Sequence, residues 1–462
     1  MTDRSIRNSR VAIVGGGLAG LAAGCALAGS GFSVTLFERR PYLGGRASSY
    51  QHPGTGEVVD NCQHVLLGCC TNLVQFYQRL GVQDKIRWYD RLTFLEPGGR
   101  ASVIYPSPLP APFHTAPAFL RASCLNLRDK IAIGRAMLAL LPSTPADRGE
   151  TFLAWLRRHG QTARAIERFW KTILVSALNE DLDCVSVTYA AQVVRESFLK
   201  SAAAGKMGVP TVPLTDLYSA AGDYIIGRGG QVHLRSGVES FQPTSDGVRL
   251  LPTSADFDFV VLAVPFDVLS RILPDESAAV PLRQALSRFE TSPITGIHLW
   301  FDRQITHLDH AVLLDRTIQW MFHKSKLLNP SATPESYVEL VVSSSKTLVE
   351  KSRQEITDLA LAELREFFPL ARSASLLKST VIKEVHATYS PRPGVDLYRP
   401  KPETGWPRVF LAGDWIATGW PATMEGAVRS GFLAAEALAR AAGSESPSCL
   451  VPDLPGAGFM RF

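Results

Sequence analysis

Residues 11–46 read VAIVGGGLAGLAAGCALAGSGFSVTLFERRPYLGGR, and this stretch decides the fold. It opens with an apolar run, residues 11–14, of the kind that forms a buried parallel strand. A helix rich in small residues is predicted over 18–28, and a second apolar strand over 33–37. Strand, helix and strand in this order predict a βαβ unit of a doubly wound sheet.

Three glycines with the spacing G-x-G-x-x-G lie in the turn between the first strand and the helix. Gly15 allows the tight turn, Gly17 lets the backbone approach a pyrophosphate, and Gly20 lets the helix pack closely on the strand. The start of the helix supplies free N–H groups and the positive end of its dipole for phosphates. An acid that ends the second strand can bind ribose hydroxyls. The residues expected to hold a dinucleotide here are Gly15, Gly17, Leu18, Ala19, Gly20 and Glu38.

A secretory signal peptide or a membrane span is the alternative interpretation of the same stretch. Arg4, Arg7 and Arg10 precede the uncharged residues 11–37, and residues 26–28 resemble a cleavage site. Neither alternative needs three glycines at this spacing, followed by a strand that ends in an acid. We therefore predict no export or spanning segment, and a cytoplasmic location with peripheral contact to the inner membrane.

Composition describes a globular chain of 462 residues, long enough for two or three domains. A hydrophobic content of 46% and a charged content of 20% fit a somewhat apolar protein, and the net charge of +5 fits a loose attraction to anionic lipid. Without a block rich in lysine and arginine, nucleic acid is not an expected partner. The seven cysteines lack the spacing of a metal site, so we predict no metal and a reducing compartment.

The residues that follow Glu38 indicate which dinucleotide is bound. Arg39 is followed after four residues by Gly44-Gly45-Arg46. This pattern resembles the extended motif of FAD-dependent amine oxidases and carotenoid desaturases, in which the glycine pair and its arginine lie along the FAD pyrophosphate. The resemblance implies FAD, whereas a simple Gly-Gly turn is the alternative.

Two later segments resemble the middle and C-terminal FAD motifs of the same superfamily. In the middle segment, a valine follows a strand at 231–234 and precedes the apolar run 258–265. In the C-terminal segment, an apolar strand ends on Gly-Asp at 413–414, and a helix begins near residue 424. The resemblance implies that the valine backbone meets adenine, that the aspartate binds a ribityl hydroxyl, and that the helix dipole points to the flavin pyrimidine oxygen. The residues concerned are Val238, Gly413, Asp414, Met424, Glu425 and Ala427.

These motifs predict an α/β fold with a Rossmann-like FAD-binding domain and an α+β substrate domain. The FAD-binding domain is expected to be discontinuous, from residues 1–85, 210–275 and 395–445. The substrate domain is expected from 86–209, its helical part, and from 276–394, its antiparallel sheet. The Ser/Pro-rich residues 446–462 are expected to form a loose tail.

Two longer strings narrow the resemblance. Residues 59–81, VDNCQHVLLGCCTNLVQFYQRLG, and residues 412–431, AGDWIATGWPATMEGAVRSG, resemble the hydroxysqualene dehydroxylases of bacterial hopanoid pathways. This family resemblance implies loss of the substrate hydroxyl as water, and quenching of the allylic carbocation by hydride from N5 of reduced FAD to give squalene. A carotenoid (phytoene-type) desaturase, an amine oxidase and a flavin-free prenyl-binding escort are the alternatives. The reductant that reloads FAD stays open.

Four residues in these strings are candidates for contact with flavin or substrate. Gln63 and His64 lie in the segment that, in the superfamily, follows the Gly-Gly-Arg turn and passes beside the isoalloxazine. His64 is the expected proton donor or hydroxyl anchor. A satisfied structural histidine is the alternative for His64. Trp415 and Trp420 can stabilise a carbocation by cation–π contact, with plain packing as the alternative.

A basic helical pair is the candidate for membrane contact. Helices predicted over 118–125 and 128–141 combine aliphatic residues with four cations, Arg121, Arg128, Lys130 and Arg135. Such a pair can lie on an anionic bilayer. Ordinary packing within the substrate domain is the alternative.

Overall fold

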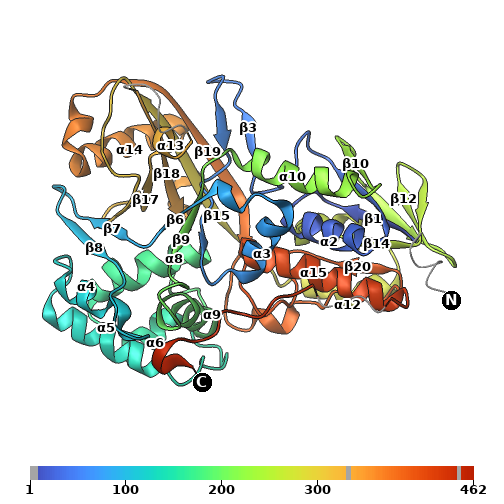
Figure 1. Ribbon diagram of the computed structural model, residues 1–462, viewed down its shortest axis with the longest axis horizontal. Coiled ribbons are helices and arrows are strands. Elements are labelled where there is room, and N and C mark those ends of the chain that lie inside the picture. The colour runs from blue at the N-terminus through green and yellow to red at the C-terminus, as the bar shows by residue number, and fades with distance from the viewer. Residues whose placement is uncertain (1–8, 329–334, 445–448, 462) are drawn as a thin grey trace.

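A parallel sheet joins the beginning, middle and end of the chain. The computed structural model describes residues 9–328, 335–444 and 449–461. The sheet has the order β10-β2-β1-β14-β20, and all four pairings are parallel (Figure 1). Its strands are β1 (Arg10–Val14), β2 (Ser33–Glu38), β10 (Gln231–Leu234), β14 (Phe259–Leu262) and β20 (Val409–Leu411). The predicted α/β class is confirmed, and residues from three distant segments share this sheet.

Helices with small side chains pack against this sheet. They are α2 (Leu18–Gly29), α10 (Leu214–Ile226) and α15 (Met424–Ala441). A Cβ atom at Gly431 of α15 would lie 2.2 Å from the carbonyl oxygen of Ala19 in α2. The two helix backbones therefore touch, which explains why α2 consists almost entirely of alanine, glycine and leucine. Helix α3 (Thr71–Leu80) lies beside α15 (Figure 1).

A seven-stranded sheet forms the second part of the molecule, in the order β19-β15-β18-β17-β16-β7-β8. Its strands are β7 (Leu92–Leu95), β8 (Ala101–Ile104), β15 (Thr291–Phe301), β16 (His310–Leu313), β17 (Trp320–Phe322), β18 (Ser336–Ser343) and β19 (Leu376–Tyr389). Helix α14 (Arg353–Phe367) buries one of its faces. The expected antiparallel sheet is in fact mixed, because β16 and β7 are parallel. The part expected to be helical also supplies β7 and β8, since their apolar side chains complete the core of the sheet.

A helical layer lies below this sheet in Figure 1. It contains α4 (Ala116–Arg121), α5 (Leu127–Leu140), α6 (Phe152–Arg158), α7 (Ala163–Ala165), α8 (Thr172–Leu178) and α9 (Val187–Val194). The π-helical turns η3 (Ile166–Lys171) and η4 (Arg195–Leu199) join α7 to α8 and extend α9. Phe152, Trp155 and Trp170 form the aromatic centre of this layer.

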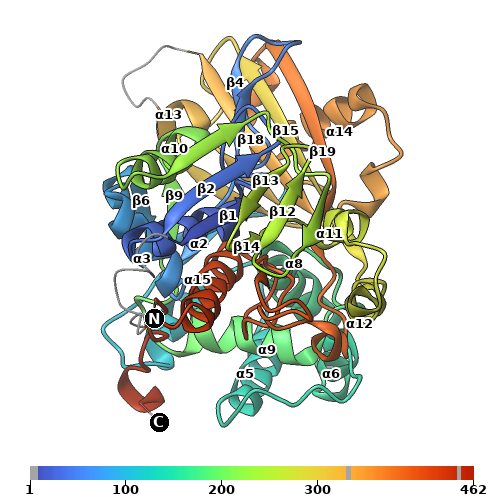
Figure 2. The same ribbon diagram turned by 90° about the vertical axis from the view of Figure 1, so that its right-hand side faces the viewer.

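Shorter elements complete the architecture (Figure 2). One small sheet pairs β3 (Ser49–Gln51) with β4 (Val58–Asp60). A second has β5 (Leu66–Leu67) and β6 (Ile86–Tyr89) on either side of β9 (Met207–Pro210). A third contains β11 (Ser240–Pro243), β12 (Val248–Leu251) and β13 (Ala255–Phe257). The short helices are α11 (Phe266–Ile272), α12 (Val280–Leu286) and α13 (Lys324–Leu328). In residues 9–328, 335–444 and 449–461, no helix has both the length and the apolar character needed to span a bilayer.

The C-terminal segment is docked on the molecule, so the expected loose tail is wrong for residues 449–461. The Val451 amide donates to Asn72 Oδ1 at 2.9 Å, and Asp453 pairs with Arg429. The Phe459 amide donates to the Ala111 carbonyl at 2.9 Å. Residues 446–448 and 462 of the predicted tail lie outside the described residues. Composition alone predicted a loose tail, whereas specific hydrogen bonds hold this segment against the rest of the molecule.

Candidate FAD and substrate site

One cavity runs from the turn after β1, past α15, to the seven-stranded sheet. Of the residues predicted for the site, it is lined by Gly15, Gly17, Leu18, Ala19, Glu38, Arg39, Gly44, Gly45, Arg46, Gln63, His64, Val238, Gly413, Asp414, Trp420, Met424, Glu425 and Ala427. The fold thus brings the three FAD-motif segments to one space. Gly20 and Trp415 are not part of its wall.

The turn between β1 and α2 has the shape that a diphosphate needs. A Cβ atom at Gly20 would lie 1.9 Å from the Gly15 carbonyl oxygen, so Gly20 lets helix and strand touch without itself facing the cavity. At Gly17 the space is open, because a Cβ atom added there would lie 3.8 Å from its nearest neighbour, Gly45 Cα. No side chain caps the N-terminus of α2, so its first amides are not satisfied by a capping residue. Amides at an open helix start fit a bound diphosphate.

Glu38 ends β2 beside the same turn. One of its carboxylate oxygens accepts a hydrogen bond from the Gly16 amide and the other from the Arg40 amide, both at 2.7 Å. The side chain is buried and fixed, and each oxygen keeps a lone pair for a ribose hydroxyl. Together with the open turn, this acceptor shows that the residues present fit a dinucleotide.

The second glycine pair packs directly on the first motif. The Gly44 amide donates to the Gly16 carbonyl at 2.9 Å, and Gly44 forms a parallel bridge with Gly17. Arg46 donates to Asp414 Oδ1 at 2.7 Å and to the Ala387 carbonyl at 2.6 Å. The arginine and the aspartate predicted for separate parts of FAD therefore bind each other across the cavity.

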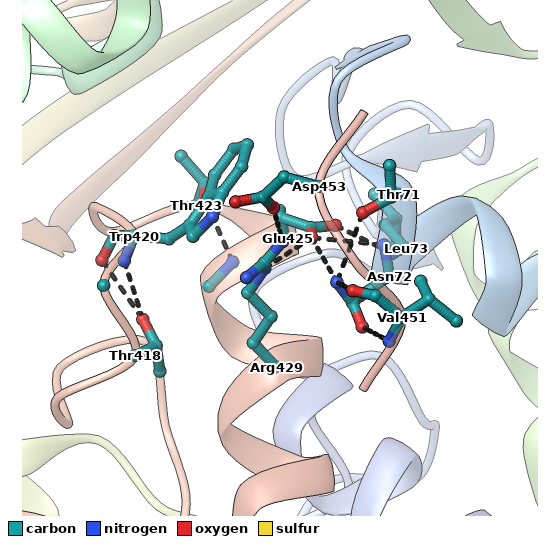
Figure 3. A network of polar contacts seen from close by, with 12 residues as sticks. Thr71, Asn72, Leu73, Thr418, Trp420, Thr423, Glu425, Arg429, Val451 and Asp453 are labelled. Atoms are coloured by element: carbon teal, nitrogen blue, oxygen red, sulfur yellow. Dashed lines mark hydrogen bonds and ion pairs between the residues drawn. The ribbon is translucent and has the colours of Figure 1, made fainter. Parts of the chain in front are cut away.

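Glu425 binds groups of the protein itself through its carboxylate. Its carboxylate accepts from the amides of Asn72 and Leu73, at 3.1 and 2.8 Å, and from Arg429 Nε at 2.7 Å (Figure 3). The side chain is fully buried and caps the N-terminus of α3 with a negative charge. The carboxylate of Glu425 thus has a structural role, because two helix amides and an arginine bind it, while the cofactor role expected from the start of α15 stays a prediction.

Met424 and Thr423 lie at the start of α15. Thr423 caps this helix by accepting a hydrogen bond from the Gly426 amide at 3.1 Å. Met424 lines the cavity, and its sulfur accepts from the Tyr218 hydroxyl at 3.4 Å. The positive end of the 18-residue helix α15 therefore faces the cavity, where a negative charge is stabilised.

The two tryptophans lie differently with respect to the cavity. Trp415 is 1% exposed and donates from its indole nitrogen to the Val264 carbonyl at 3.0 Å, so it packs in the core and does not contact substrate. Trp420 does line the cavity, but the guanidinium carbon of Arg429 already lies 4.7 Å from its ring centroid. The cation–π contact found at Trp420 is one within the protein.

Beyond the motif residues, the cavity continues as a mostly apolar chamber between α8, η4 and the seven-stranded sheet. Its wall includes Leu92, Phe94, Ile173, Ala177, Val193, Phe198, Ile294, Val312, Trp320, Phe322 and Val341. The few polar groups are largely paired: the Trp320 indole donates to Ser176 Oγ at 2.7 Å, and Glu196 pairs with Lys200 at 2.7 Å. Such a wall fits a long apolar ligand. No pattern in the sequence predicted these residues, because they come from many separate strands and helices between residues 92 and 341.

His64 and Gln63 lie between the two halves of the cavity. His64 Nδ1 lies 2.8 Å from the Cys62 carbonyl oxygen, so it carries the proton, and Nε2 is left as an acceptor. Burial lowers the pKa of His64, so the ring is neutral near pH 7. The predicted role of proton donor is corrected to that of acceptor or hydroxyl anchor. Gln63 Nε2 donates to the His64 carbonyl at 3.0 Å.

A buried charged cluster behind this segment was not predicted. Lys324 Nζ donates to Asp60 Oδ2 at 2.6 Å and to Gln63 Oε1 at 2.9 Å, and lies 3.5 Å from Glu339 Oε2. All three charged side chains are at most 4% exposed. Burial raises the pKa of Glu339 to about 8. Asp60 stands in the quoted string 59–81, but nothing in the sequence around residue 324 indicates that its lysine is buried.

Comparison with known proteins identifies the family of this chain. The profile described as flavin containing amine oxidoreductase matches residues 18–439. The chain belongs to this family. It is therefore a flavin-dependent oxidoreductase, and the predicted cofactor FAD is confirmed. As an oxidoreductase it is not a flavin-free escort.

Similar proteins cover nearly the whole chain. The 15-cis-phytoene desaturase of Synechococcus elongatus is 29% identical, over 93% of this chain and 95% of its own length. The chloroplast and chromoplast 15-cis-phytoene desaturase of Glycine max is 27% identical, over 95% of this chain and 80% of its own length. The solved structure of cyclohexylamine oxidase from Brevibacterium oxydans is 18% identical, with a TM-score of 0.68, and the match covers 94% of this chain and 99% of the oxidase. The similarity to cyclohexylamine oxidase shows a shared fold and nothing further.

Proposed function

We propose that this family member transfers hydride between FAD and a carbon of a long, apolar isoprenoid. The observation that carries the proposal is the continuous cavity, in which the three FAD-motif segments open into an apolar chamber. FAD, when bound, supplies hydride chemistry at its N5 atom. The named activities of the phytoene desaturases, which act on isoprenoids, support a substrate of this class.

For the specific reaction, we propose the reductive dehydroxylation of hydroxysqualene to squalene. The strings that resemble hydroxysqualene dehydroxylases, residues 59–81 and 412–431, contribute Gln63, His64, Trp420 and Met424 to the cavity wall. Relatives at 26–29% identity support the superfamily, whereas the residues beside the flavin determine which reaction follows. In the proposed reaction the C–O bond breaks and a C–H bond forms with the hydride from reduced FAD. The hydroxyl leaves as water with the proton that reduced FAD also releases, so that hydroxysqualene and FADH2 would give squalene, FAD and water.

The residues of the chain have three tasks in this reaction. His64 Nε2 accepts a hydrogen bond from the substrate hydroxyl and positions it. The apolar wall, with Phe322 and Val341 next to the histidine segment, keeps water from capturing the carbocation. Lys324 holds the amide of Gln63 in one orientation, which in turn supports the backbone of His64.

Carotenoid-type desaturation is the second candidate, and the similar proteins favour it because they are named phytoene desaturases. In that direction FAD accepts hydride, and neutral His64 suits the removal of the accompanying proton. An amine oxidase has the description of the family and the likeness of fold in its favour, but the mostly apolar wall of the chamber suits an isoprenoid better.

One anaerobic experiment separates the two candidates. The protein is reduced in D₂O and mixed with hydroxysqualene, and the oxidised protein is mixed with phytoene in parallel. Squalene that carries one deuterium, without a desaturated product, supports dehydroxylation. Desaturated carotene with no squalene would replace dehydroxylation by desaturation, and no turnover of either isoprenoid would refute the proposed substrate class.

A further inference from the structure

The surface formed by α4, α5 and the C-terminal segment carries a concentration of exposed apolar side chains. Within the described ranges, six large apolar side chains between residues 109 and 138 are exposed, and one more lies in the C-terminal segment. Their exposed fractions run from 47% for Phe113 to 69% for Leu127. We call this set the docking face: Leu109, Phe113, Leu120, Leu127, Ile131, Leu138 and Phe459.

These side chains form stripes on two neighbouring helices. Leu127, Ile131 and Leu138 are spaced by four and seven residues along α5, so they share one side of that helix. Phe113 and Leu120 are seven residues apart in the continuous helical run 113–121, whose last part is α4. Both helices lie at the edge of the molecule opposite the N-terminus (Figure 1).

Specific contacts join the parts of the docking face. Lys130 Nζ of α5 donates to the Leu120 carbonyl of α4 at 2.7 Å. The ring of Phe459 meets that of Phe113 at a centroid distance of 6.3 Å, and its amide is bound by Ala111. The C-terminal segment therefore adds its phenylalanine to the same surface. Lys130, one of the four cations predicted for membrane contact, links the two helices.

In the segment 97–146, which carries six of the seven residues of the docking face, the exposed charges have one sign. From residue 97 to 146 the only acid is Asp129, which is buried in the capping box of α5. The same segment contains five basic residues, of which four are exposed: Arg121, Arg128, Arg135 and Arg100, the last paired with Glu96. Exposed Arg461 follows Phe459. Apolar stripes bordered by arginines and without exposed acids match an anionic lipid surface.

The docking face is connected to the cavity wall through few residues. Arg195 donates to the carbonyls of Leu140 and Leu141 at the C-terminal end of α5. Its neighbours Glu196, Ser197 and Phe198 line the cavity. A lipid surface against α5 would thus lie next to the helix that walls the apolar chamber.

We propose that the docking face inserts into the surface of an anionic bilayer and holds the protein there as a peripheral protein. The apolar side chains enter the boundary between headgroups and acyl chains, while Arg128 and Arg135 contact lipid phosphates. This proposal goes beyond the proposed reaction, and its test reads vesicle binding without turnover.

The test is flotation of the FAD-bound protein with vesicles of phosphatidylcholine and phosphatidylglycerol in a ratio of about 3:1. Leu127→Ser/Ile131→Ser tests the apolar part, and Arg128→Gln/Arg135→Gln tests the charged part. Matched controls are Leu377→Ser/Leu397→Ser and Lys351→Gln/Lys401→Gln, which change exposed residues elsewhere. Flavin absorbance and thermal melting establish that each variant is folded.

The wild type is expected to float with anionic vesicles and to detach at high salt. The serine pair should reduce partitioning at least about tenfold, and the glutamine pair about fivefold per residue, while both control pairs bind like the wild type. Equal loss in the control pairs, or unchanged binding in the test pairs, would overturn the proposal. A concentration-dependent dimer in analytical ultracentrifugation, abolished by the serine pair in the absence of vesicles, would assign the face to a second copy of the chain instead.

Discussion

Replacement of Lys324 by methionine tests whether the buried cluster behind His64 is ionised. The ammonium group binds Asp60 at 2.6 Å and Gln63 at 2.9 Å, and it is 2% exposed. Burial on its own would raise the pKa of Asp60, but the charge of Lys324 and its hydrogen bond outweigh burial and hold this pKa below its usual value. Methionine keeps much of the side-chain volume and removes the charge and all of the donors.

The expected loss of stability follows from the partners that remain. Breaking a buried ion pair by removal of one member costs about 3–5 kcal/mol, and the lost hydrogen bond to Gln63 adds about 1 kcal/mol. Asp60 keeps its bonds from Ser49 Oγ at 2.5 Å and the Leu214 amide at 3.2 Å, which favours the lower end of this range. Against a total stability of about 5–15 kcal/mol, Lys324→Met should be strongly destabilised.

The assay is urea unfolding of the FAD-bound protein at pH 7, followed by circular dichroism and flavin fluorescence. The matched control is Lys171→Met, which breaks the half-exposed pair with Glu167 and should cost less than about 1 kcal/mol. The double variant Asp60→Asn/Lys324→Met should recover part of the loss, because the charge of Asp60 is then no longer left buried without its cation. If Lys324→Met unfolds like the Lys171→Met control, the cluster is not ionised and the reasoning fails.

The remaining predictions concern pH, capping and the cofactor. Glu339 has a pKa of about 8 in the folded chain against an ordinary 4.5. The free energy of unfolding should therefore fall as pH rises through this interval, by at most about 1.4 kcal/mol per pH unit. Glu339→Gln should remove that fall in urea titrations between about pH 5 and 8, and an unchanged slope would exclude Glu339 as its source. Glu425→Gln should lose about 2 kcal/mol of stability by weakening the cap of α3, with the FAD dissociation constant of the folded protein unchanged; a large loss of FAD affinity at full stability would support its predicted cofactor role. Glu38→Ala should weaken FAD binding by about 1.5–3 kcal/mol in fluorescence titration, and Gly17→Val should nearly abolish it, so wild-type occupancy in the valine variant would refute the assignment of Gly17. Acid precipitation should release all of the yellow colour, since we predict FAD without a covalent bond, and colour kept in the pellet would contradict this.

The cofactor half of the molecule could be predicted because its information is local. The glycine spacing, the acid that ends β2 and the apolar runs 11–14 and 258–265 each specify their own segment, and backbone geometry then brings them together. The bonds of the Glu425 carboxylate were not predicted, for the opposite reason. Its partners, Asn72 and Leu73, lie more than 350 residues away along the chain, and no local pattern marks a side chain that caps a different helix.

The substrate half escaped prediction because its residues share only a position in space. Strands β7 and β8 join the seven-stranded sheet by a parallel pairing with β16, more than 200 residues later, which local periodicity cannot reveal. Trp415 and Trp420 illustrate the same limit at close range. Five residues apart in one loop, one is a core residue bound to Val264 and the other faces the cavity.

The position of the buried cluster links the chemistry of the cavity to the junction of the two halves. Asp60 ends β4 and binds the Leu214 amide at the start of α10, which packs on the cofactor sheet, whereas Lys324 and Glu339 belong to the seven-stranded sheet and its helix α13. Gln63 and His64 lie on the short segment between these anchors. A charge pair at this junction fixes the cofactor half and the substrate half relative to each other, and it fixes His64 at the same time. If the pair is broken, stability and the orientation of the substrate hydroxyl should therefore change together, whereas breaking the distant cap at Glu425 should change stability alone.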